Sequence, residues 1–344
     1  MPDKNVLVIG GGVAGLSAAI DLARLGVGVE LVEKADALGG HARQFSCKAT
    51  EKCVRCGACV VEEKLRDALE HSNISVSLNS EIQKLTKSGG RFSAELQKKD
   101  GESRTSETDA IILATGFRAF DPENKKPYGY KLFDNVITNL ELERMLREKS
   151  IVSRPSDQQM PKKIAFVQCV GSRDSKLGNL WCSKICCGSA LRMARLIKMR
   201  QPETEITFFH IDVQTFGRDF QTFYEAAQNE VRMVRAIPGD VFKTDDDGLK
   251  VSCFDNSAQE NVDEIFDLLV LSVGITPGRD TKNLSALLNL KTTDTGFFEA
   301  SQEGIFTAGA ALGPMSIAEA VASAGYAACE ALNYLDIQKN WELG

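Results

Sequence analysis

The chain has 344 residues, and its 43% of hydrophobic residues can supply two buried cores. The formal net charge of −6 is spread without a basic stripe, so we expect no nucleic-acid partner. No apolar signal region opens the sequence and no apolar run approaches the length of a membrane span. We therefore expect a soluble, cytoplasmic protein that is not bound to a membrane.

The first 120 residues predict a βαβ unit followed by a series of short strands. The βαβ unit consists of a strand over 5–9, a helix over 13–25 and a strand over 29–32. A loop rich in glycine and cysteine follows up to residue 60. A helix over 61–72 and several short strands come next, and an apolar strand over 110–114 closes this part of the chain.

The turn after the first strand has the glycine spacing of a dinucleotide-binding site. Gly10 permits the tight turn, Gly12 lets a pyrophosphate approach, and Gly15 lets the helix and strand pack closely. Glu33 ends the second strand, 18 positions after Gly15, where its carboxylate can accept hydrogen bonds from the ribose hydroxyls of an adenosine. The pyrophosphate would lie on the helix N-terminus. The predicted contacts of this turn are Gly10, Gly12, Val13, Ala14 and Gly15.

The rest of the chain predicts an inserted second α/β unit. It begins with an apolar strand over 164–168 and continues through a helix over 188–198 and strands over 206–209 and 268–273. A helix over 316–335 follows near the C-terminus. We predict a discontinuous first domain over 1–120 and 271–344, a linker over 121–163 with one helix near 139–149, and an inserted domain over 164–270.

Three adjacent aspartates, Asp245, Asp246 and Asp247, precede Gly248 inside the inserted domain. The pattern predicts a hairpin turn, and a site for a hard cation is the less favoured alternative.

Four cysteines stand where a second glycine loop would follow the strand over 164–168. Cys169, Cys182, Cys186 and Cys187 offer soft thiolate ligands, which select zinc or iron–sulfur clusters. Adjacent cysteines are awkward for a zinc knuckle, whereas a cubane distributes its ligands over separate irons. We therefore predict a [4Fe–4S] cluster at this turn.

A second group of cysteines lies in the glycine-rich loop of the first domain. Cys47, Cys53, Cys56 and Cys59 could hold an alternative or second cluster. Cys53 and Cys56 could instead form a redox dithiol, or the loop could face a partner protein. The remaining cysteines, Cys253 and Cys329, are predicted to pack in the core.

Three further segments, Gly39-Gly40, Ala114-Thr115-Gly116 and 304–309, resemble the flavoprotein disulfide reductase superfamily. The resemblance implies an α/β fold like that of thioredoxin reductase, with two Rossmann-type domains of three-layer ββα character, and FAD as the dinucleotide. The family usually has aspartate where this chain has Ala310, so the ribityl chain must be held differently. The resemblance adds these candidate FAD contacts: Lys34, Gly39, Gly40, His41, Ile82, Ala114, Thr115, Gly116, Gly309, Ala310, Ser316 and Ile317.

The segments 166–174, 178–179, 182–183, 186–187 and 309–314 resemble the HdrA component of heterodisulfide reductase more closely. This resemblance implies a [4Fe–4S] cluster beside FAD, a homodimer, and partner iron–sulfur subunits similar to HdrB and HdrC. Archaeal members also carry an N-terminal domain and ferredoxin modules. The chain lacks both and resembles a short form found in sulfur-oxidising bacteria.

These patterns predict an oxidoreductase subunit that transfers electrons through FAD and a [4Fe–4S] cluster in disulfide or sulfane-sulfur metabolism, with the substrate chemistry on partner subunits. One alternative is a stand-alone disulfide oxidoreductase that uses Cys53 and Cys56 and needs no pyridine nucleotide. Another is a non-catalytic scaffold that carries the cofactors.

Overall fold

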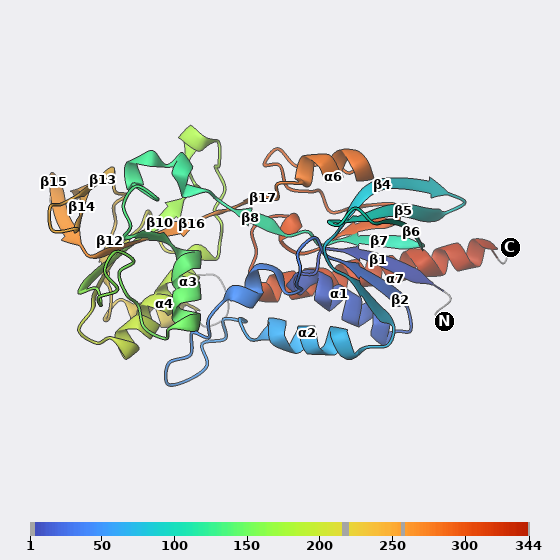
Figure 1. Ribbon diagram of the computed structural model, residues 1–344, viewed down its shortest axis with the longest axis horizontal. Coiled ribbons are helices and arrows are strands. Elements are labelled where there is room, and N and C mark those ends of the chain that lie inside the picture. The colour runs from blue at the N-terminus through green and yellow to red at the C-terminus, as the bar shows by residue number, and fades with distance from the viewer. Residues whose placement is uncertain (1–3, 215–219, 256–258, 343–344) are drawn as a thin grey trace. The chain divides into compact units, whose positions relative to one another are not determined.

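The computed structural model describes residues 4–214, 220–255 and 259–342. These residues form two compact units (Figure 1). Unit 1 consists of the described residues of 1–43, 57–118 and 276–344, and unit 2 consists of those of 44–56 and 119–275. The chain passes between the units in β8 (Phe117–Ala119) and β17 (Ile275–Pro277), and these two strands pair with each other.

Unit 1 is built in three layers around a mainly parallel sheet. The strand order is β18-β19-β7-β1-β2-β3, and only β18 is antiparallel to its neighbour. Helices cover one face of this sheet, and the antiparallel sheet β4-β5-β6 covers the other (Figure 1). The strands are β1 (Asn5–Ile9), β2 (Gly28–Val32), β3 (Ile74–Ser77), β4 (Ser80–Ser88), β5 (Arg91–Lys98), β6 (Ser103–Thr108), β7 (Ala110–Leu113), β18 (Ser301–Gln302) and β19 (Ile305–Thr307). The helices are α1 (Val13–Arg24), α2 (Val60–Glu70), α6 (Thr281–Leu288) and α7 (Ile317–Glu342).

Unit 2 repeats this three-layer plan. Its sheet has the order β12-β11-β10-β16-β9, with every pairing parallel. Alternate residues of β10 enter two cores: Ile164 and Phe166 pack with the helices, whereas Ala165 and Val167 pack with the antiparallel sheet β13-β14-β15. The strands are β9 (Val136–Thr138), β10 (Lys163–Val170), β11 (Glu205–Phe209), β12 (Arg232–Val234), β13 (Asp240–Lys243), β14 (Leu249–Asp255), β15 (Glu260–Phe266) and β16 (Leu268–Val273). The helices are α3 (Asn139–Glu148), α4 (Cys186–Arg200) and α5 (Phe220–Ala227).

The predicted fold class, with two Rossmann-type units of ββα character, is confirmed, but the boundaries differ. The stretch 121–163 is not a linker, because β9 lies at the edge of the unit 2 sheet and α3 packs on its core. β9 has only three residues, too few for a visible alternation of apolar and polar side chains. The helix predicted near 139–149 is confirmed as α3. Cys253 is partly buried as predicted, but Cys329 is exposed on α7.

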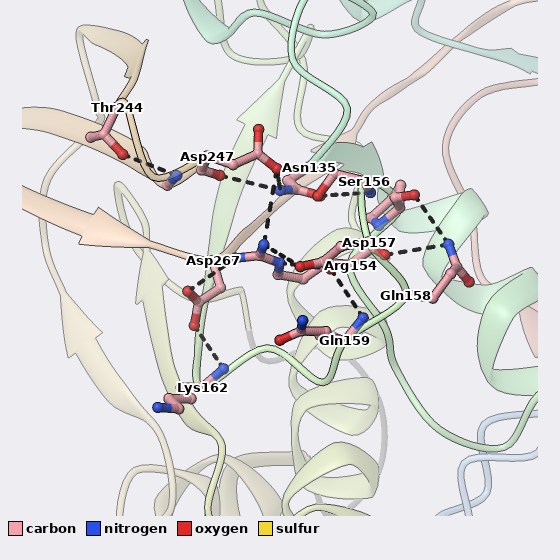
Figure 2. Close-up of polar contacts among 12 residues, drawn as sticks. Asn135, Arg154, Ser156, Asp157, Gln158, Gln159, Lys162, Thr244, Asp247 and Asp267 are labelled. Atoms are coloured by element: carbon pink, nitrogen blue, oxygen red, sulfur yellow. Dashed lines mark hydrogen bonds and ion pairs between the residues drawn. The ribbon is translucent and has the colours of Figure 1, made fainter.

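The three aspartates form the predicted hairpin turn between β13 and β14. Figure 2 shows that Asp247 contributes to a network around Arg154 rather than to a group of carboxylates alone. The Arg154 guanidinium forms ion pairs with Asp157, Asp247 and Asp267. Asp267 in turn accepts the backbone N–H groups of Lys162 and Lys163. One arginine therefore joins the hairpin to the segment that leads into β10.

A buried ion pair fixes the segment 44–56 to the helices of unit 2. Lys48 Nζ lies 2.6 Å from Glu143 Oε1, and both side chains are less than 5% exposed. The same carboxylate accepts hydrogen bonds from Ser46, through its N–H and Oγ, and from Ser189 Oγ of α4. The cysteine-rich segment therefore belongs to unit 2 although its neighbours in sequence belong to unit 1.

Among the described residues, none of the helices combines the length and apolar character needed to cross a membrane.

Replacing Lys48 with Met should lower the free energy of unfolding of unit 2 by about 3–5 kcal/mol, because Glu143 would remain as an uncompensated buried charge. Lys163→Met removes an exposed ion pair with Glu205 and should cost at most about 1 kcal/mol. The double variant Lys48→Met/Glu143→Leu should recover most of the loss. Urea unfolding followed by circular dichroism measures all three, and equal losses in the two single lysine variants would contradict the assignment.

Candidate cofactor sites

The glycine turn of unit 1 brings β1, α1 and the end of β7 into close contact. Gly10 has φ +108°, and a Cβ atom there would lie 2.4 Å from Ala114 O. A Cβ atom at Gly15 would lie 1.8 Å from Gly10 O. Both positions therefore need glycine for the backbone to pack, as the sequence predicted.

Gly12 differs from these two glycines because its missing side chain faces open space. No atom of the protein lies within 4 Å of a Cβ built there. Gly12 forms the N-cap of α1, where free N–H groups and the helix dipole attract an anion. Gly40 and Gly309 approach the same turn, since Cβ atoms on them would lie 3.2 Å from Gly12 Cα and 2.5 Å from Ala14 Cβ. The geometry fits the pyrophosphate of a dinucleotide.

Glu33 supports this turn directly. Its carboxylate accepts the N–H of Gly11 at 2.7 Å and the N–H of Ala35 at 2.9 Å. A carboxylate has about four lone-pair sites, so it retains acceptors for ribose hydroxyls. The adjacent Lys34 forms an ion pair with Asp280.

The other predicted FAD contacts are spread over unit 1. His41 stacks on Phe117, with ring centroids 4.5 Å apart, next to Gly116 in the left-handed conformation at φ +68°. Ser316 caps α7, because its Oγ accepts the N–H of Glu319. The remaining predicted contacts lie as follows: Gly39 beside Gly11, Ile82 in β4, Thr115 after β7, Ala310 in a short 3-10 helix and Ile317 at the start of α7.

A Gly12→Ala protein should fold normally but bind FAD several-fold more weakly, because the added methyl group occupies the space in front of the α1 N-terminus. Gly15→Ala should instead lower the thermal unfolding midpoint of the flavin-free protein, since its Cβ overlaps Gly10 O. Flavin content and thermal unfolding of each variant separate the two effects. Loss of stability in Gly12→Ala, or full stability in Gly15→Ala, would contradict this interpretation.

The cysteines predicted to follow β10 line one cavity in unit 2. Cys169 lies near the end of β10, and Cys186 and Cys187 form the first turn of α4. This is the strand–turn–helix position at which unit 1 has its glycine turn. The residues around the cavity are Cys169, Ser172, Arg173, Cys182, Ser183, Lys184, Cys186, Cys187, Asp212 and Gln214.

The loop between Cys169 and Cys182 folds back on itself, and this explains how their distant positions converge. Asp174 and Asn179 pair through two backbone hydrogen bonds of 2.9 and 3.1 Å, and the N–H of Arg173 donates to Trp181 O. The predicted role of Trp181 as a shield is not tested, but its indole N–H donates to Ile275 O at 2.9 Å. The intervening residues thus return the chain to its starting point.

Three residues of this site that are not glycine adopt left-handed backbone conformations. Cys169, Arg173 and Lys184 have φ values of 60°, 54° and 61°. Each such residue costs of order 1–3 kcal/mol and persists only where the surrounding structure imposes it. Strain of this kind is concentrated at functional sites.

Burial keeps the thiols of the cavity in their neutral form. It raises the pKa of Cys169 to about 12, and the neighbouring Cys187 thiol adds to that rise. Burial is also the main cause of the raised pKa of Cys186 and of Cys187. Four thiolates would therefore require the positive charge of a bound group.

The donor set fits an iron–sulfur cubane better than a single metal ion. Within the described ranges, no three His, Cys, Asp or Glu side chains are grouped closely enough to hold one ion. A cubane separates its four ligands over four irons, so its cysteines converge more loosely. The space between the side chains is about 10 Å³, so a cluster would require the thiols to rotate apart.

The structure divides the other cysteine group between the two units. Cys47, Cys53 and Cys56 belong to the segment fixed in unit 2, whereas Cys59 precedes α2 in unit 1. Cys47, Cys53 and Cys59 are exposed and Cys56 is half-buried. The N–H of Arg55 lies 3.4 Å from Cys53 Sγ.

Sequence reasoning did not identify Arg173, Asp212 and Gln214 as part of the cysteine site. Arg173 lies within the segment 166–174 that carries the family resemblance, so a signal was present for it. Asp212 and Gln214 follow β11, and only the parallel pairing of β10 with β11 brings them to the cavity.

Alanine at Gly171 should disrupt the cysteine loop more than alanine at Gly178. Both glycines have positive φ, at 80° and 73°, so either substitution costs about 1 kcal/mol in backbone strain. Only at Gly171 would the Cβ also overlap a side chain, 1.9 Å from the Phe120 ring. We expect Gly171→Ala to have the lower unfolding midpoint and the faster maleimide labelling of buried thiols in metal-free protein. Equal behaviour of the two variants would contradict this expectation.

Comparisons with known proteins agree with the fold and the resemblance. Residues 4–165 match the family model described as pyridine nucleotide-disulphide oxidoreductase. The chain resembles two thioredoxin reductases of known structure, from T. acidophilum and Lactococcus lactis. Both have a TM-score of 0.63, at 17% and 18% identity; they match 97% and 96% of this chain and 99% of their own lengths. At these identities the likeness concerns the fold.

Two archaeal relatives, both HdrA proteins, align with nearly the whole chain. The one from the H(2):CoB-CoM heterodisulfide,ferredoxin reductase of Methanothermobacter marburgensis is 29% identical, and an iron–sulfur HdrA of the CoB–CoM heterodisulfide reductase of Methanopyrus kandleri is 30% identical. Both alignments include 96% of this chain, which spans only 63% and 64% of the relatives' lengths. The chain is a homologue of the HdrA proteins of heterodisulfide reductase and lies within the flavoprotein disulfide reductase superfamily.

Proposed function

We propose that the chain is an electron-transfer subunit that binds FAD in unit 1 and a [4Fe–4S] cluster in unit 2. The observation that carries this proposal is the replacement of the second glycine turn by a cavity lined with four cysteines. A turn without the glycine triplet lacks the cradle for the pyrophosphate of NADH or NADPH. Thiols at the same position suit a group that passes single electrons.

The residues of unit 1 would hold and orient the flavin. The α1 N-terminus at Gly12 would bind the pyrophosphate, and Glu33 would accept the adenosine ribose hydroxyls. Bound FAD would supply the conversion between two-electron and one-electron transfer. In unit 2, Cys169, Cys182, Cys186 and Cys187 would hold the cluster.

The wider role follows from the relatives, whose names describe components of heterodisulfide reductase. We propose that this chain acts in a related complex in the cytoplasm, as a homodimer, with iron–sulfur partner subunits and with disulfides or sulfane sulfur as substrates. All ten cysteines are free thiols, as expected in a reducing compartment.

A second candidate function is a disulfide oxidoreductase that uses Cys53 and Cys56. The observation in its favour is that Cys53 is exposed and Cys56 only half-buried, so both thiols are accessible to a substrate. This activity would need no cluster in unit 2.

Anaerobically purified protein should contain flavin, iron and acid-labile sulfide, and its reduced form should give a cubane signal in electron paramagnetic resonance. The variant Cys187→Ser should lose that signal and most of the iron, because Cys187 is one of the four proposed ligands. The variant Cys56→Ser should keep both. Loss of the signal only in Cys56→Ser, rapid flavin reduction by NADH or NADPH, or the absence of iron from all samples would overturn the proposal, and the last result would favour the dithiol enzyme.

A further inference from the structure

Arg173 and Asp212 form a forked ion pair beside the cysteines of unit 2. Arg173 Nη1 lies 2.5 Å from Asp212 Oδ1, and Nη2 lies 3.1 Å from Oδ2. Gln214 donates to the same carboxylate at 2.9 Å. The arginine side chain is 26% exposed and the aspartate side chain 41%, so the pair lies at the mouth of the cavity rather than in its interior.

Both members of this pair are held in place by the backbone. Arg173 has a left-handed φ of 54°, and its N–H donates to Trp181 O within the folded loop. Asp212 lies three residues after β11, and its carbonyl oxygen accepts a weak hydrogen bond from Cys187 Sγ at 4.0 Å. The pair therefore links the loop between Cys169 and Cys182 to the segment beside Cys187.

The two charges act on the sulfur atoms in opposite directions. The positive charge of Arg173 lowers the pKa of the Cys169 and Cys187 thiols, whereas the negative charge of Asp212 raises it. Each charge thus reaches at least two of the proposed cluster ligands. A cation near a cluster stabilises an added electron and an anion destabilises it, so local charge and hydrogen bonds set the reduction potential.

We propose that Arg173 and Asp212 are positioning residues that hold the cysteine loop closed and adjust the reduction potential of the cluster. This inference rests on the proposed cluster in unit 2. The fork geometry is specific to arginine, because a lysine ammonium cannot form two parallel hydrogen bonds with one carboxylate. The charge on position 173 and the fork it forms are therefore separable by substitution.

Redox titrations followed by electron paramagnetic resonance test the pair through the cluster potential. Arg173→Gln should shift the potential to more negative values, because it removes a cation and leaves Asp212 unpaired. Asp212→Asn should shift it to more positive values. Arg173→Lys, which keeps the charge but loses the fork, should stay near the wild-type potential and show faster maleimide labelling of cavity thiols in metal-free protein.

The control is Arg195→Gln, which breaks a similar forked pair between Arg195 of α4 and Glu230, away from the cavity. It should leave the potential unchanged. Shifts of opposite sign in Arg173→Gln and Asp212→Asn support the inference; where Arg173→Gln retains no cluster, the shift in Asp212→Asn and the labelling of Arg173→Lys decide it.

A wild-type potential in all cluster-loaded variants, or shifts of the same sign, would overturn the role of the pair alone. Wild-type protein without iron would overturn the proposed function as well.

Discussion

The burial of four thiol groups at the carboxyl edge of a parallel sheet is the constraint on which unit 2 depends. A buried thiolate is costly unless a positive charge compensates it, and burial accordingly raises the pKa of Cys169 to about 12. The surrounding backbone accepts left-handed conformations at three residues that are not glycine in order to bring the thiols together. Such a site is stable only if the bound group returns more free energy than the strain and desolvation require.

A second constraint is non-local and concerns the segment that holds Cys47, Cys53 and Cys56. Lys48 and Glu143 are nearly a hundred positions apart, and each would be an uncompensated buried charge without the other. Their pairing, together with the hydroxyl of Ser189, fixes the segment to α3 and α4. The cysteines of this loop are thereby assigned to the same unit as the cavity, while the chain before and after them belongs to unit 1.

The sequence was informative where local patterns suffice. Apolar strands, glycine spacing and helix boundaries predicted α1, α3 and the two Rossmann-type units, and the position of Cys169 before a helix that begins with Cys186 predicted their convergence. It was not informative where pairing between distant residues decides. The three residues of β9 carry no periodic signal, and Asp212 reaches the cavity only because β11 pairs with β10. The Lys48–Glu143 pair has no local signature either.

The two units show how one architecture can bind different groups through a single turn. In unit 1, backbone N–H groups face open space at Gly12, and such a cradle recognises phosphate whichever nucleotide carries it. In unit 2, the corresponding turn presents thiol side chains, which recognise soft metals instead. A nicotinamide carrier must leave after each hydride transfer, whereas a cluster bound by four cysteines stays in place. The change at this turn therefore replaces exchange of a soluble carrier with transfer of electrons to another protein, and this is why the proposed function requires partner subunits.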